Sequence, residues 1–131
     1  MAIYLARTGQ SMDVIRKRME EYYPEISKMT VDNIRPKCEI DTLGQFISCQ
    51  TSVPQAIVCF LEATSFEDAI RNAISLGGDA DTQAAIAGSM AEAFFGVPYE
   101  LEDAAIEFLP SNLQSIYYAF DTVKKKRIKR N

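Results

Sequence analysis

The chain has 131 residues, of which 47% are hydrophobic and 24% charged, a composition typical of one globular domain with a core. Its formal net charge of −4 and its pI of about 4.8 make nucleic acid an unlikely partner, because a negative surface repels phosphate. No apolar run approaches the ~20 residues that span a bilayer, and the N-terminus lacks a secretory signal pattern. We therefore expect a cytoplasmic protein without membrane contact.

The chain has three cysteines, with no Cys-x-x-Cys pair, and no histidine. Cys38, Cys49 and Cys59 thus indicate reduced thiols rather than a disulfide framework or a zinc site. The lack of histidine removes the commonest general base and the commonest zinc ligand. Any chemistry is expected to use carboxylates, hydroxyls, lysine, tyrosine, cysteine or a metal held by oxygen atoms.

The first helix is predicted over residues 11–23, SMDVIRKRMEEYY, where apolar residues recur at helical spacing. Ser11 is its expected N-cap and Pro24 ends it. Residues 24–50 are less regular, because prolines, a glycine and mixed polar residues interrupt them. They predict a loop with room for one short helix.

Two helices are predicted in the middle of the chain. Residues 54–63, PQAIVCFLEA, are apolar nearly all round, which indicates a buried helix. Ser52 is its expected N-cap, and Pro54 suits the first turn, where no backbone N–H is needed. Residues 66–76 form the next helix, and Gly77 follows as its C-terminal glycine.

Helices are also predicted over residues 81–95, which are rich in alanine, and over residues 101–109 and 112–123. No alternating strand pattern of useful length occurs, so the fold class is expected to be all-α. We expect a single helical domain over residues 1–123. Residues 124–131 contain six basic residues and are expected to form a solvated tail.

Two aspartates and a threonine follow a pair of glycines in GGDADTQAAIAG, residues 77–88. One interpretation is structural: Asp79 caps the helix, and Asp81 and Thr82 satisfy free N–H groups in its first turn. The other is a hard-cation site, since Mg²⁺, Mn²⁺ and Ca²⁺ prefer carboxylate and hydroxyl oxygens. Spacing alone favours the cap, because such caps are common. A cap needs only one side chain, however, and three oxygen-bearing side chains lie within four residues.

The motif does not match the familiar ion and phosphate loops. An EF-hand is excluded, because its calcium loop would have Ala84 at the glycine position and Met90 at the bidentate glutamate. The glycines form neither a Gly-x-Gly-x-x-Gly pattern nor a P-loop.

These residues carry a family resemblance. The segment GGDADTQAAIAGSMAEAFFG resembles the signature of the ADP-ribosylglycohydrolases, in which Gly-Gly-Asp-x-Asp-Thr precedes a small-residue helix that ends near Phe-Gly. The segment SVPQAIVCFLEATSFEDAIRNAISLGGD resembles the two family helices that lead into this motif, and Ile-Arg-Pro at residues 34–36 also fits. The resemblance covers roughly residues 34–98, about half of the chain.

The resemblance implies a compact multi-helix orthogonal bundle, similar to the C-terminal half of the family's fold. It implies that Asp79, Asp81 and Thr82 are ligands of two divalent cations, Mg²⁺ or Mn²⁺, with Asp81 bridging them. The cations would bind the distal ribose of ADP-ribose and polarise water for hydrolysis at the anomeric carbon. Ser52 would line the substrate cleft, although an N-cap role explains this residue equally well.

The family's other metal ligands, a threonine followed by two aspartates in the N-terminal half, have no counterpart in this sequence. Thr30-Val31-Asp32 and Asp41-Thr42 are not substitutes. One hypothesis is therefore half of an ADP-ribosyl hydrolase site, completed by an N-terminal half or by another copy, with ADP-ribose or an ADP-ribosylated protein as ligand. The second is a truncated, non-catalytic relative that forms oligomers and binds a cation or nucleotide weakly. The third is a structural helical module in which Asp79 is only a cap.

Overall fold

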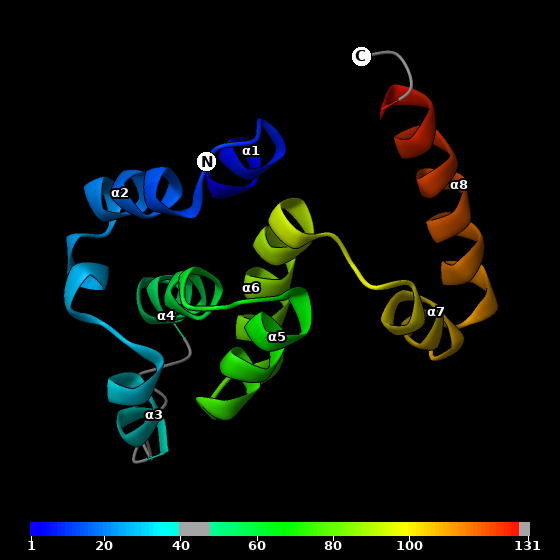
Figure 1. The fold of residues 1–131 in the computed structure, drawn as a ribbon. Helices are drawn as coiled ribbons and strands as arrows, with labels where there is room; N and C mark the ends of the chain where they lie inside the picture. Colours follow the sequence, from blue (N-terminus) through cyan, green and yellow to red (C-terminus); the bar gives the residue numbers. More distant parts are fainter. Residues whose placement is uncertain (40–47, 129–131) are drawn as a thin grey trace. The chain divides into compact units, whose positions relative to one another are not determined.

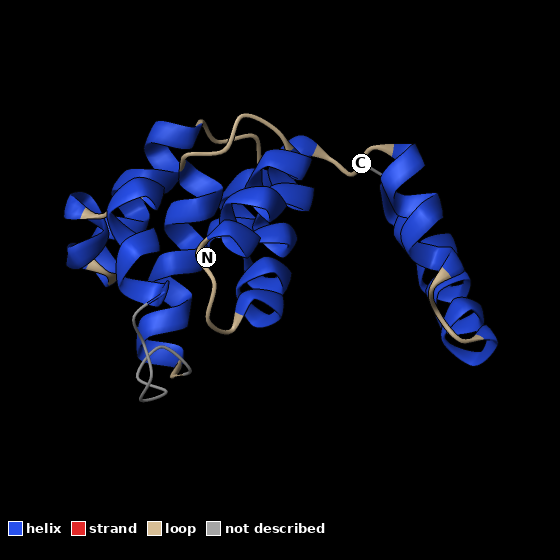
Figure 2. Ribbon diagram, turned by 90° about the horizontal axis from the view of Figure 1, so that it is seen from below, coloured by secondary structure: helices blue, strands red, loops and turns tan. Residues whose placement is uncertain are grey.

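The computed structural model describes residues 1–39 and 48–128 (Figure 1). The chain divides into two compact units, Met1–Gly96 and Val97–Asn131, and each is described by itself. Throughout the described residues the backbone forms helices joined by loops, without a strand (Figure 2). The all-α class is confirmed. The predicted single domain over residues 1–123 stays a prediction.

Unit 1 contains six α-helices and one 3-10 helix within its described residues. These elements are α1 (Ala2–Arg7), α2 (Met12–Tyr22), η1 (Pro24–Lys28), α3 (Val31–Glu39), α4 (Cys49–Leu61), α5 (Phe66–Ser75) and α6 (Ala80–Phe95). The two longest, α4 and α6, pack against each other, and α5 packs against both. The core is therefore assembled around the helices that flank the glycine-aspartate motif.

Helix α4 is the centre of this core. Every residue from Pro54 to Leu61 is buried, as expected for a helix with an all-round apolar surface. Phe60 is fully buried, and its ring lies edge-to-face with Phe94 and Phe95 of α6, at centroid distances of 6.0 and 6.4 Å. Such aromatic contacts add to the free energy of apolar burial and fix α4 against the C-terminal end of α6.

Helices α5 and α6 approach each other closely at Gly88. A β-carbon built at this glycine would lie 2.7 Å from Cδ1 of Ile70, which is well inside van der Waals contact. The small residues of α6 thus have the packing role that the sequence indicates.

Replacement of Gly88 by valine is therefore expected to lower the free energy of unfolding by about 1–3 kcal/mol, because the branched side chain overpacks the α5–α6 contact. Chemical denaturation measures this loss. Gly88→Ala is the graded control: the end of the Ile70 side chain can rotate away from one methyl group, so a smaller loss is expected. Equal stability of Gly88→Val and wild type would contradict the contact.

Two of the predicted helices begin at serine caps. The backbone N–H of Val14 donates to Ser11 Oγ at 3.4 Å at the start of α2. At the start of α5, the N–H of Asp68 donates to Ser65 Oγ at 3.1 Å. Asp68 in turn accepts from the N–H of Thr64 at 2.8 Å. Each cap satisfies N–H groups that the helix itself leaves unpaired.

The N-terminal boundary of α4 corrects one prediction. The helix begins at Cys49, with Ser48 at the N-cap position, so Ser52 is a buried residue inside the helix and not its cap. Pro54 lies within the helix as well. A proline at this position removes one backbone hydrogen bond, and the burial of the surrounding residues offsets that loss.

The segment before α4 is also more helical than predicted. It contains η1 and α3, where one short helix was expected, and α1 lies in an N-terminal stretch with no predicted helix. Pro36 lies within α3. Gly44 and the Asp41-Thr42 pair lie outside the described residues.

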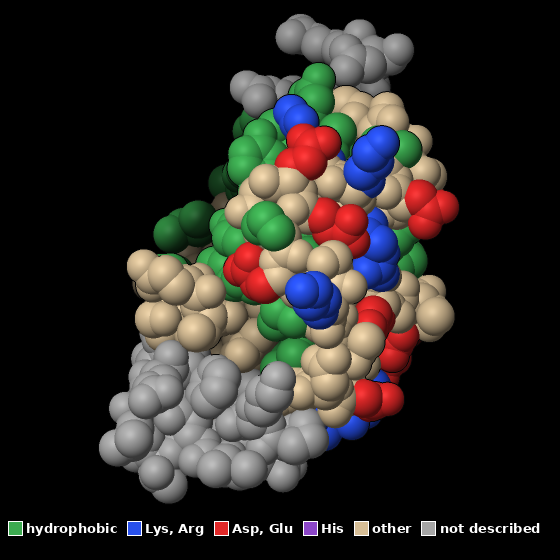
Figure 3. Space-filling model, turned by 90° about the vertical axis from the view of Figure 1, so that its left-hand side faces the viewer, with side chains coloured by type: hydrophobic (Ala, Val, Ile, Leu, Met, Phe, Trp, Pro, Cys, Tyr) green, Lys and Arg blue, Asp and Glu red, His purple; other side chains and the backbone are tan. Residues whose placement is uncertain are grey.

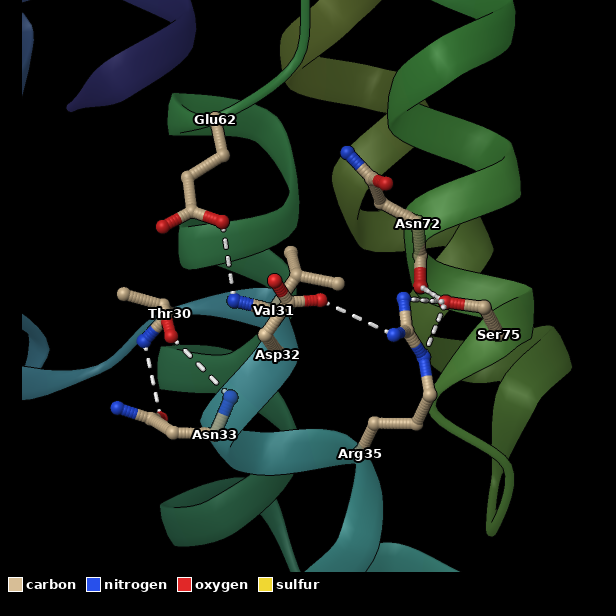
Figure 4. Close-up of polar contacts among 8 residues, drawn as sticks. All are labelled: Thr30, Val31, Asp32, Asn33, Arg35, Glu62, Asn72 and Ser75. Atoms are coloured by element: carbon tan, nitrogen blue, oxygen red, sulfur yellow. Dashed lines mark hydrogen bonds and ion pairs between the residues drawn. The ribbon is translucent and has the colours of Figure 1, made fainter.

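Polar contacts connect α3 to α4 and α5 (Figure 4). Thr30 Oγ1 accepts from the N–H of Asn33 at 3.1 Å, and Asn33 Oδ1 accepts from the N–H of Thr30 at 3.0 Å, which is a reciprocal cap. Glu62, at the end of α4, accepts from the N–H of Val31 at 3.0 Å. Thr30 thus caps α3.

The side of the molecule that Figure 3 shows carries acidic and basic side chains in a mixed pattern, with apolar side chains between them. A mixed pattern of this kind offers a polyanion no continuous basic surface among the residues described there. None of the described helices is both long and apolar enough to cross a membrane. A cytoplasmic location stays a prediction.

Unit 2 contains α7 (Tyr99–Glu107) and α8 (Ser111–Ile128). Both agree with predicted helices, but α8 continues past residue 123, so the helix includes most of the expected tail. Side chains of α8 make polar contacts with α7 and with the loop that follows it. Gln114 Nε2 donates to the carbonyl oxygens of Ile106 and Leu109 at 3.2 and 2.9 Å, and the Tyr117 hydroxyl donates to Glu102.

Candidate metal centre

A pair of glycines forms the turn between α5 and α6. Gly77 and Gly78 have φ angles of +78° and +63°, in the left-handed region that favours glycine. A β-carbon at either position would meet nothing within 4 Å, so the requirement is for backbone conformation rather than for space. The two glycines reverse the chain and place the following aspartates at the beginning of α6.

Replacement of Gly77 by alanine is expected to destabilise the fold by about 1–2 kcal/mol, since an alanine β-carbon is strained in the left-handed conformation. A shift in the midpoint of urea denaturation measures this loss. Gly9 has a similar φ of +74° and also has open space around it, so Gly9→Ala controls for the conformational cost away from the motif. A neutral Gly77→Ala would mean that the turn can adopt another conformation.

Asp79 lies at the N-cap position of α6 but does not act as a side-chain cap. Its carbonyl oxygen accepts from the N–H of Gln83 at 3.0 Å, which begins the helix. Its side chain, by contrast, makes no capping hydrogen bond to the first turn. The interpretation of Asp79 as a capping side chain therefore accounts for its place in the chain but not for the orientation of its carboxylate.

Asp81 and Thr82 are exposed in the first turn of α6. Asp81 Oδ1 accepts from the N–H of Thr82 at 2.9 Å. The pKa of Asp81 lies below its ordinary value, first because the Asp79 side chain is within hydrogen-bonding reach, and second because the N–H groups of Thr82 and of Asp81 itself donate to the carboxylate. The structure therefore brings Asp79 and Asp81 together and favours the ionised form of Asp81.

This arrangement fits part of a hard-cation site. Two adjacent carboxyl groups and a neighbouring hydroxyl supply the oxygen atoms that Mg²⁺ and Mn²⁺ prefer. These groups lie at the N-terminal end of α6, where the carboxylate of Asp81 is ionised. Mg²⁺ requires about six ligands, several of which are commonly water. Across residues 1–39 and 48–128, no group of three or more histidine, cysteine or acidic side chains could hold a metal ion. The three residues therefore fit one side of a coordination shell.

Ser52 is a buried residue of α4, the helix that packs against α6. Gln55, one turn further along α4, is buried and accepts at Oε1 from Nε2 of Gln83, the residue after Thr82, at 2.8 Å. Residues three apart share a helix face, so Ser52 lies on the face of α4 that carries this contact. Ser52 therefore lies one helical turn before Gln55, which contacts Gln83 beside the candidate ligands.

The Gln55–Gln83 pair is a buried polar contact between α4 and α6 that the motif analysis missed. Both amides are buried, and Gln83 Oε1 has no hydrogen-bond partner among the described residues. Unpaired polar atoms of buried amides are uncommon, because an unmade hydrogen bond there costs free energy. In the sequence, Gln83 follows directly after Asp-Thr, in a helix made mostly of small and apolar residues.

The two cavities described in unit 1 are separate from the candidate ligands. One, of about 440 Å³, has an apolar lining that includes Val53, Ile57 and Ile86. The other, of about 510 Å³, includes Asn33, Ile34 and Gln55. Asp79, Asp81 and Thr82 line neither, and the three residues lie on the surface around the start of α6.

The described residues form helices, and α6 begins at a Gly-Gly-Asp-x-Asp-Thr turn. A sequence model of the family described as ADP-ribosylglycohydrolase matches residues 2–107. The chain belongs to this family.

Three relatives are similar to part of the chain, and each bears the name ADP-ribosylhydrolase ARH3. The Bos taurus protein is 35% identical over an alignment of 77 residues, which covers 50% of this chain and 21% of that protein. The Homo sapiens and Mus musculus proteins are 39% and 38% identical over alignments of 69 residues, which cover 44% of this chain and 19% of each relative. This chain thus spans about a fifth of the length of the relatives it matches. No solved structure matches it.

Proposed function

We propose that this chain supplies part of the active site of a metal-dependent ADP-ribosyl hydrolase, which cleaves ADP-ribosyl N- or O-glycosidic bonds. The family and the name of the relatives support the reaction class. The observation that carries the assignment of the site is the Asp79–Asp81 pair, since the Asp79 carboxylate at an N-cap position is not used as a cap. ADP-ribose or an ADP-ribosylated protein is the corresponding ligand.

Asp79, Asp81 and Thr82 are the residues that would hold Mg²⁺ or Mn²⁺. When bound, the metal supplies Lewis-acid and templating chemistry at the ribose. The residues of this chain contribute negative charge, which draws the cation. The glycine turn places Asp79 and Asp81 at the start of α6, where their carboxylates lie close together.

The remaining ligands come from outside this sequence, from a complementing N-terminal half or from another polypeptide. A second candidate function follows from the small number of ligands: a non-catalytic relative that binds a cation or nucleotide weakly. The lack of a third acidic, cysteine or histidine side chain near Asp79 and Asp81, among the residues described, favours this alternative for the chain alone. The two functions differ in whether hydrolysis appears when the other half is supplied.

The test combines binding and turnover. Mn²⁺ is expected to raise the melting temperature of the chain, and ADP-ribose is expected to add to that shift. Hydrolysis of ADP-ribosyl-arginine and ADP-ribosyl-serine peptides is expected only after addition of a fragment that carries the Thr-Asp-Asp ligands of the family. Hydrolysis by the chain alone would disprove the half-site. Binding without turnover in the mixture would favour the non-catalytic alternative.

A further inference from the structure

The C-terminal end of α5 leads directly into the glycine turn, and its last helical turn contains no basic residue. The end of a helix carries partial negative charge on carbonyl groups that have no partner within the helix, and a cation there is stabilising. Arg35 of α3 supplies this cation from another helix (Figure 4). Its side chain therefore links α3 to the end of α5.

The guanidinium of Arg35 is held on both of its edges. Nε and Nη2 donate to Ser75 Oγ at 3.3 and 3.1 Å, and Nη1 donates to Asp32 Oδ1 at 3.1 Å. The Ser75 hydroxyl itself donates to the carbonyl oxygen of Asn72 at 2.8 Å. Because a guanidinium is planar and rigid, these contacts fix both its own orientation and the position of the Ser75 side chain. A lysine at this position could not make the forked contact.

Helix α3 is a firm base for this contact. Val31 and Ile34 are only 5 and 4% exposed, and Glu62 at the end of α4 accepts from the N–H of Val31 at 3.0 Å. Arg35 directly follows Ile34, so the start of its side chain is held close to the core. Arg35 also belongs to the Ile-Arg-Pro segment, for which the candidate metal ligands provide no role.

The glycine turn is the least constrained part of the motif. Leu76 is fully buried, but Gly77 and Gly78 follow it without side chains, and nothing lies within 4 Å of where their β-carbons would be. The N–H of Gly77 donates to the carbonyl oxygen of Ile74, in the last turn of α5, at 3.2 Å. Glycine permits many backbone conformations, so the direction of the chain beyond Leu76 depends on how well this last turn is held.

We infer that Arg35 is a positioning residue for the Asp79–Asp81 pair. By holding Ser75, it keeps the last turn of α5 closed and directs the glycine turn, which places both carboxylates at the start of α6. Arg35 acts through α5 and not by contact with the cation. The inference rests on the proposed metal-binding function.

Two measurements on the full chain test this role. Arg35→Lys keeps the charge but loses the fork. It is expected to speed amide hydrogen exchange at Gly77 and Gln83, on either side of the aspartates, by about threefold or more, the effect of one hydrogen bond of ordinary strength. Calorimetry is expected to show Mn²⁺ binding weakened by about three- to tenfold, less than the roughly 10–100-fold contribution of residues that contact metal ligands directly. Ser75→Ala is expected to reproduce both changes, and the double variant to add little to either.

Arg71→Lys is the matched control. Arg71 Nε and Nη2 make a similar forked contact with Glu67 Oε1, at 2.8 and 2.6 Å, but within α5 and one turn before its end. The substitution removes a fork and keeps the charge, without loosening the link to α3. Amide exchange at Gly77 and Gln83 and the affinity for Mn²⁺ are expected to remain unchanged.

The inference is wrong if Arg35→Lys binds Mn²⁺ as tightly as a wild-type chain that does bind it. This holds even where the melting temperature of the variant falls, because a purely structural contact would lower stability alone. Equal losses in Arg35→Lys and Arg71→Lys would also contradict it. A wild-type chain that binds no Mn²⁺ would instead disprove the proposed metal site, and the exchange rates alone would then decide whether Arg35 holds the turn.

Discussion

Replacement of Phe60 by alanine is expected to lower the free energy of unfolding by about 3–5 kcal/mol, the largest stability effect of any single substitution proposed for this chain. Phe60 is fully buried near the C-terminal end of α4, and its ring contacts two phenylalanines of α6 edge-on. Alanine removes the apolar surface and leaves a cavity between α4 and α6. Because domains of this size are stable by only about 5–15 kcal/mol, we expect a greatly lowered denaturation midpoint.

Phe108 provides the matched control, because it is 89% exposed in unit 2. Phe108→Ala makes the same chemical change without a cavity and is expected to alter stability by no more than about 0.5 kcal/mol. Urea denaturation followed by circular dichroism compares the two variants. Losses of similar size would mean that the α4–α6 contact is not the centre of the core.

The helices that could be predicted from the sequence have both an amphipathic or small-residue pattern and a clear local boundary. Helix α5 has Ser65 before it and Gly77 after it, and α6 ends at Gly96, whose φ is +77°. These signals act within a few residues, so they can be recognised without knowledge of the tertiary structure.

Boundaries that depend on packing could not be predicted. Pro54 suggests the first turn of a helix, yet α4 begins five residues earlier, because the burial of Ser52 and Pro54 outweighs the loss of one backbone hydrogen bond. Helix α1 is too short to show a period, although Ala2 and Ala6 are buried. In each case contacts with distant segments determine the structure.

The sequence predicted which residues form the candidate site, but only part of their arrangement in space. The proximity of Asp79 and Asp81 follows from their spacing around a turn. The Asp79 side chain does not cap α6 because of its orientation, and the spacing of residues along the chain does not determine side-chain orientation. The hydrogen bond between Gln55 and Gln83 joins residues 28 positions apart, and no local pattern encodes such a contact.

Replacement of Asp81 by asparagine is expected to reduce the affinity of the chain for Mn²⁺ by at least about a hundredfold, since even residues that only support metal ligands commonly contribute 10–100-fold. Asparagine keeps the size of the side chain and removes the charge that the neighbouring N–H groups stabilise. Calorimetry with Mn²⁺ and with Mg²⁺ measures the change. Asp79→Asn is expected to show a similar loss, because its carboxylate makes no competing capping bond.

Asp13 makes this test specific. It is an acidic residue in the first turn of α2, behind Ser11, as Asp81 is in the first turn of α6 behind Asp79. Asp13→Asn therefore removes the same charge from the same helical position without a second carboxylate nearby. We expect unchanged Mn²⁺ affinity in this control. If Asp13→Asn and Asp81→Asn weaken binding equally, the effect is one of overall charge and the cap interpretation of Asp79 is the better one. If only the Asp79 and Asp81 variants lose binding, the paired carboxylates hold the cation, because helix position and net charge are the same in the control.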